Sequence, residues 1–111
     1  MPVISHFVGS LDVTVGTSWV AKRSEDFTNF GADGALPSGL KFVELAVVNK
    51  HGSNSGYAAG FEIDSAAAKT SRVNVAAGAA LTVELDGSSE VASFAGSGAG
   101  TTLHLIAKFE A

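Results

Sequence analysis

The chain has 111 residues, a net charge of −4 and no cysteine, which excludes disulfides and thiolate metal sites. This length suits one domain with one core, spanning residues 1–111, and charged residues, at 16%, fall below the roughly one quarter typical of globular chains. The mild acidity, with Lys22-Arg23 as the only adjacent basic pair, argues against nucleic acid as a partner.

Two short strands are predicted near the N-terminus, at residues 3–8 and 11–15. In the second, Leu11, Val13 and Val15 alternate with polar residues, the pattern of a strand with one buried face.

The first of these strands has two interpretations. It carries no full charge, so as a sheet edge it is poorly protected and could pair with another chain. Val3 and Ile4 are then candidate contact residues. Alternatively, the strand lies inside the domain's own sheet.

A long connection follows, residues 16–39, and it holds the only tryptophan, Trp19. Ser24, followed by two acidic residues, predicts the N-cap of a short helix with Phe27 and Phe30 on one face. We expect this segment to be a lid over one end of the fold rather than a contact surface. As a contact surface it would use the aromatic and basic residues typical of binding hot spots, namely Trp19, Lys22, Arg23, Phe27 and Phe30.

Alternation continues to the C-terminus. Residues 40–48 predict a central strand that buries Val43, Leu45 and Val47, with Phe42 on a second covered face. Further strands are predicted at residues 57–63, 72–76, 81–85, 90–95 and 103–109, separated by glycine- and serine-rich turns. About eight short strands at regular spacing indicate an all-β fold, an antiparallel β-sandwich of the jelly-roll type.

No catalytic or metal-binding constellation emerges. His6, His51 and His104 lack metal-ligand spacing, although pairing of the terminal strands could bring His6 near His104. The glycine run 96–100 precedes a strand instead of a helix, so it predicts a hairpin loop and not a phosphate site. The acidic pairs Glu25 with Asp26 and Glu62 with Asp64 are interpreted as solvated. We therefore expect no enzyme activity, no metal, no cofactor and no small-molecule substrate.

The N-terminus shows no basic region followed by an apolar run, and no stretch is apolar enough to span a bilayer. The expectation is a soluble protein, made in the cytosol, with no membrane partner.

One phrase of the sequence resembles a known family. Residues 73–85, VNVAAGAALTVEL, form a predicted strand, an Ala-Gly turn and a second strand. Together with the length and the cysteine-free composition rich in Ala, Gly and Ser, this resembles the small jelly-roll decoration proteins of tailed bacteriophage capsids, in particular the staple protein of the epsilon-fifteen type of short-tailed phage.

The resemblance implies a structural protein that binds the outside of the shell and bridges neighbouring copies of the major capsid protein. It also implies self-association, as a dimer about a two-fold axis, and a location on the virion after synthesis in the host cytoplasm. It assigns no role to any single residue of this chain.

Two other functions stay open from the residues alone. A carbohydrate- or receptor-binding sandwich of a phage fibre could use Trp19 with Asp26 and Asn29, or Tyr57 with Asn54. A small enzyme on a cupin-like jelly roll would need a cluster of His and Glu that the sequence does not supply.

Overall fold

The computed structural model describes residues 6–29, 34–59, 73–84 and 90–111. The described residues form nine strands and one 3-10 helix, and none of their helices could cross a bilayer. The elements are β1 (His6–Val15), β2 (Val20–Lys22), η1 (Ser24–Asp26), β3 (Thr28–Asn29), β4 (Lys41–Asn49), β5 (Gly56–Ala59), β6 (Val73–Val75), β7 (Ala80–Glu84), β8 (Ala92–Gly96) and β9 (Thr101–Glu110).

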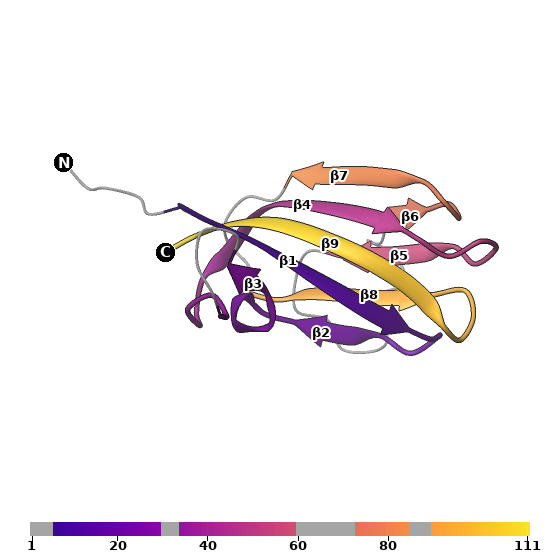
Figure 1. The fold of residues 1–111 in the computed structure, drawn as a ribbon, viewed down its shortest axis with the longest axis horizontal. Coiled ribbons are helices and arrows are strands. Elements are labelled where there is room, and N and C mark those ends of the chain that lie inside the picture. Colours follow the sequence, from indigo (N-terminus) through magenta and orange to yellow (C-terminus); the bar gives the residue numbers. More distant parts are fainter. Residues whose placement is uncertain (1–5, 30–33, 60–72, 85–89) are drawn as a thin grey trace.

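Two antiparallel sheets pack face to face as a β-sandwich (Figure 1). One sheet has the order β3-β1-β9-β4-β7 and the other β2-β8-β5-β6. The pairs are nested along the chain: β1 with β9, β2 with β8, β4 with β7 and β5 with β6. A chain doubled on itself and rolled across two sheets in this way is a jelly roll, so the predicted fold class is confirmed.

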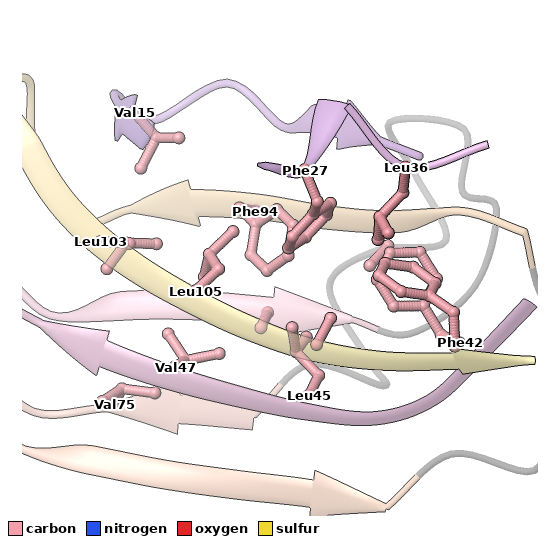
Figure 2. Packing of buried hydrophobic residues seen from close by; sticks show 14 of the residues in the cluster. Val15, Phe27, Leu36, Phe42, Leu45, Val47, Val75, Phe94, Leu103 and Leu105 are labelled. Carbon is pink, nitrogen blue, oxygen red and sulfur yellow. The ribbon is translucent and has the colours of Figure 1, made fainter. Parts of the chain in front are cut away.

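The core lies between the sheets and runs along their length (Figure 2). On β9 the alternation predicted from the sequence holds at every position, since its inward side chains are fully buried and the others are not. At one end of the core three phenylalanine rings pack together, with centroids 4.5 to 5.8 Å apart. The members of this ring cluster are Phe27, Phe42 and Phe109.

The N-terminal prediction of two strands is wrong, because residues 6–15 form one strand. β1 pairs with β9 along its whole length, from His6 opposite Glu110 to Val15 opposite Thr101. The apparent break is Gly9, where a Cβ would lie 2.8 Å from Leu36 Cδ1 and 2.9 Å from the Thr28 carbonyl oxygen. Gly9 is therefore present for the close approach of another segment, and it does not mark a turn.

The predicted central strand exists as β4, but its phase is wrong at the start. The register shifts between Phe42 and Glu44, as in a β-bulge, so Val43 is an extra residue. The shift turns Phe42 into the core beside Leu45, and Val43 is only half-buried. Simple alternation placed these two side chains the other way round.

The long connection contains two short strands that the sequence analysis missed, β2 and β3, and a shorter helix than expected. The N-cap of η1 is Arg23 and not Ser24. The Asp26 carboxylate accepts a hydrogen bond from the Arg23 backbone N–H at 2.9 Å. Ser24 is buried, and its hydroxyl donates to the Pro37 carbonyl at 2.6 Å and accepts from the Leu40 N–H at 3.3 Å.

The lid interpretation of this connection is confirmed at Phe27. This side chain is 1% exposed and packs edge-on against Phe42 and Phe109. Leu36 and Leu40, from the same connection, are also buried. Phe27, Leu36 and Leu40 thus close one end of the sandwich.

The predicted strand at residues 81–85 is β7, an edge strand with Leu81 opposite Val47 and Val83 opposite Leu45. This register puts both side chains on the core side of the sheet, as the alternation predicts. Leu81 is nonetheless 38% exposed, because β7 has a neighbour on one side only among the described residues.

Candidate partner-binding site

The residues predicted as contacts do not form one patch. Phe27 is in the core, so its assignment as a contact residue is wrong. Its side chain packs in the aromatic cluster and is too buried to touch a partner. Lys22 is half-buried at the end of β2, and Arg23 is exposed next to it. Trp19 lies at the other end of β2 and is half-buried. Phe30, Val3 and Ile4 lie outside the described residues.

The predicted open edge at residues 3–8 is described only from His6 onward. There the strand lies in the domain's own sheet, paired with β9 on one side. On its other side, described pairing is limited to Gly9 with Asn29 and Ser10 with Thr28. The described part of β1 is therefore an edge for most of its length, and Val8, on its outer face, is 38% exposed.

The terminal strands do pair, but their register separates the two histidines. His6 lies opposite Glu110, and His104 lies opposite Asp12. His104 Nδ1 and Asp12 Oδ1 are 2.6 Å apart. This hydrogen bond is the main cause of a lowered pKa at Asp12, to which Lys50 adds a smaller electrostatic contribution. Among the described residues, no three His, Asp or Glu side chains are grouped as metal ligands.

Four chain reversals gather at one end of the sandwich (Figure 1). We call them the loop end; it comprises residues 16–19, 50–55, 76–79 and 97–100. Hydrogen bonds join the reversals to one another and not only to their own strands. Gly96 N–H donates to the Gly16 carbonyl at 2.8 Å, Ser55 N–H to Ser97 Oγ at 3.0 Å, and Ser97 N–H to the Ser55 carbonyl at 2.9 Å.

Asn49 is the centre of this network. It is fully buried at the end of β4, and its Nδ2 donates to the carbonyls of Asn54, at 2.8 Å, and Val75, at 3.0 Å. Its Oδ1 accepts the His51 backbone N–H at 3.0 Å. One side chain thus connects the 50–55 loop to β6, in the opposite sheet.

Asn54 makes the next connection, from the 50–55 loop to the 97–100 turn. Its Nδ2 donates to Thr101 Oγ1 at 3.1 Å and to the Ala99 carbonyl at 3.3 Å. Buried Thr101 in turn donates from its hydroxyl to the Gly98 carbonyl at 2.8 Å.

His51 holds its own loop. Its Nδ1 accepts the backbone N–H groups of Ser53, at 3.0 Å, and Asn54, at 2.8 Å. A ring nitrogen that accepts two amide hydrogens carries none itself, so the proton of the neutral ring is on Nε2. These two hydrogen bonds fix the serine- and glycine-rich loop.

An aromatic pair lies beside the loop end. The rings of Trp19 and Tyr57 have centroids 6.5 Å apart and are tilted by 38°. Val20 pairs with Phe94 and Tyr57 with Ala95, so β8 lies between β5, which carries Tyr57, and β2, which begins directly after Trp19. Both rings are half-buried on the outer face of the four-stranded sheet, where small Ala95 is buried between them.

Sequence analysis identified this site only in part. Trp19 was a predicted contact, and Tyr57 with Asn54 belonged to the carbohydrate hypothesis, but the pairing of the two rings was not predicted. The role of Asn49 was also missed. A signal for it exists: Asn49 continues the buried series of Leu45 and Val47, and a polar side chain at a buried position must be hydrogen-bonded.

Comparisons with known proteins leave the family open. No protein-family model matches the chain, and no curated protein sequence matches it. A solved structure described as a cyanophage Pam1 capsid asymmetric unit contains a chain with 12% identity to this one. The alignment covers 96% of this chain and 84% of that chain, with a TM-score of 0.36. A likeness at this distance carries no argument about function.

Proposed function

We propose that this chain is a structural protein of a bacteriophage virion, which binds the outer surface of the capsid and bridges neighbouring copies of the major capsid protein. The proposal joins the sequence resemblance given above to one structural observation: an end of the sandwich whose loops are hydrogen-bonded to one another. Self-association as a dimer and location on the virion form part of the same proposal.

The cross-connected loop end supports a binding function because binding is costly when loops must first be ordered. Loops already fixed by Asn49, Asn54 and His51 lose little conformational freedom when a partner covers them. Trp is also a residue type enriched at binding hot spots. A half-buried Trp19 beside such a surface gives it an apolar anchor.

The mechanism of stabilisation would be thermodynamic linkage. A protein that binds only the assembled shell stabilises that state by its binding free energy, about 2.7 kcal/mol per site at a free concentration one hundred times the dissociation constant. Many sites per shell multiply this contribution.

The test is binding of the purified protein to empty, expanded phage heads from the phage that encodes it. We expect saturable co-sedimentation and a higher temperature of head disruption. Trp19→Ala is expected to weaken binding without unfolding the protein, whereas Val8→Ala, at an exposed position on the opposite sheet, is its matched control. Failure to co-sediment, together with specific signals on a glycan array, would replace the capsid with a carbohydrate partner.

A further inference from the structure

Charge is distributed unevenly over the described molecule. The four segments of the loop end contain no Asp or Glu, and their one full positive charge is the exposed Lys50. Asp12, on the outer face of the five-stranded sheet that also contains β4, is hydrogen-bonded to His104 and close enough to Lys50 for a weak electrostatic interaction. The other described carboxylates lie along the strands or at the opposite end, at Glu25, Asp26, Glu44, Glu84, Glu90 and Glu110.

The exposed side chains of the loop end are also small. Gly, Ala, Ser and Thr occupy most of its exposed positions, among them Thr17, Ser53, Ala77 and Ala99. Small side chains let a partner come close to the backbone, whose N–H and C=O groups can then form hydrogen bonds across the interface. Because the loops are already connected, these groups have fixed positions.

From these features we infer that the loop end is the surface that faces the capsid, and that it meets a protein surface bearing carboxylates opposite Lys50. This inference rests on the proposed function and adds an orientation to it. A chain with a net charge of −4 approaches an acidic surface most easily by the end whose four described loop segments carry no carboxylate. The opposite end carries charges of both signs, Glu25, Asp26 and Glu110 together with Arg23 and Lys41, so it offers an acidic partner no comparable carboxylate-free surface.

The strand β4 offers a matched pair of variants. Lys41 begins this strand and Lys50 directly follows it, so the two residues are about 30 Å apart by strand geometry, and both are exposed. Lys50→Glu and Lys41→Glu make the same change of charge at opposite ends of the molecule. Binding of each variant to empty heads is measured by co-sedimentation, and thermal unfolding checks that both remain folded.

We expect Lys50→Glu to raise the dissociation constant by about tenfold or more, and to do so less at high salt, while Lys41→Glu binds as the wild type does. Equal effects of the two variants, or a stronger effect of Lys41→Glu, would overturn the orientation. If the wild-type protein itself does not bind empty heads, the proposed function is wrong, whatever the two variants do.

A second pair of variants does not depend on Lys50. Ala77→Glu puts a carboxylate on an exposed turn of the loop end, whereas Thr82→Glu puts one on the exposed outer face of β7. We expect weakened binding from Ala77→Glu alone. If Thr82→Glu abolishes binding and Ala77→Glu does not, the outer face of the five-stranded sheet is the docking surface, and the inference is wrong.

Discussion

At the scale of single residues, the sandwich depends on a few buried polar side chains with complete hydrogen bonding. Asn49 has no apolar equivalent, because its amide satisfies two carbonyls and one N–H from two segments, the 50–55 loop and β6. Ser24 has the same role at the other end, between η1 and the Pro37–Leu40 segment. Removing one such partner leaves the others buried and unpaired, which costs more than one ordinary hydrogen bond.

We therefore expect Asn49→Ala to lower the free energy of unfolding by about 2 to 4 kcal/mol. Urea denaturation followed by circular dichroism measures this value. Asn74→Ala, at an exposed position on β6, is the matched control and should change stability by less than about 0.5 kcal/mol. Equal losses in the two variants would contradict the role assigned to Asn49.

Acid should weaken the protein through Asp12. The hydrogen bond with His104 holds the pKa of Asp12 below its ordinary value of 3.8. A carboxyl group whose pKa is lower in the folded state stabilises that state above the unfolded pKa, and the contribution disappears as the pH falls through the folded pKa. In Asp12→Asn this contribution is absent at every pH.

The measurement is the melting temperature of both proteins between about pH 6 and pH 2. We expect a wild-type advantage near neutrality that shrinks below about pH 4. The advantage should be small, since both side chains are partly exposed. Two curves that stay parallel throughout this range would show that the pair makes no pH-dependent contribution.

At the scale of elements, the lid side chains Phe27, Leu36 and Leu40 are needed to close the core. Phe27→Ala should lower the free energy of unfolding by about 3 to 5 kcal/mol, because it removes a ring from the aromatic cluster and leaves a cavity. Denaturant unfolding checks the value, with Val8→Ala as a control at an exposed site. Equal stability of the wild type and Phe27→Ala would contradict the role of this ring in closing the core.

Regular alternation made most strands predictable, and the failures have local causes. Residues 101–110 alternate without interruption, and the strand forms as predicted. At Val43 a bulge adds one residue, which reverses the phase that simple alternation assumes. β2 has three residues and is too short to show a period at all.

The candidate site was less predictable, because it depends on strand order. Trp19 and Tyr57 meet only because β8 separates β2 from β5, and no local pattern encodes that order. The hydrogen bonds from Asn54 to Ala99 and Thr101 likewise join segments far apart in the chain. Sequence alone could predict turns in these segments, but not that the turns contact one another.

At the scale of the whole molecule, the fold is closed by its last strand. β9 lies in the middle of the five-stranded sheet, between β1 and β4, and buries Leu103, Leu105 and Phe109. The N-terminal strand cannot complete its pairing until the C-terminal strand is present. Such long-range pairing is typical of proteins that fold slowly.

A chain shortened to residues 1–100 should therefore fail to fold. We expect loss of the β-sheet signal in circular dichroism and no cooperative thermal transition. Removal of Ala111 alone, an exposed residue beyond β9, is the control and should leave both intact. A cooperative transition in the shortened chain would mean that the remaining strands form a stable sheet without β9.

The pairing of His6 with Glu110 has a practical consequence for engineering. Because of this pairing, the start of β1 and the end of β9 lie at the same end of the sandwich, the end remote from residues 50–55 and 97–100 (Figure 1). In the orientation proposed above, a fluorescent protein or an antigen fused after Ala111 would project outward from the particle, and the attached cargo would not obstruct its anchorage.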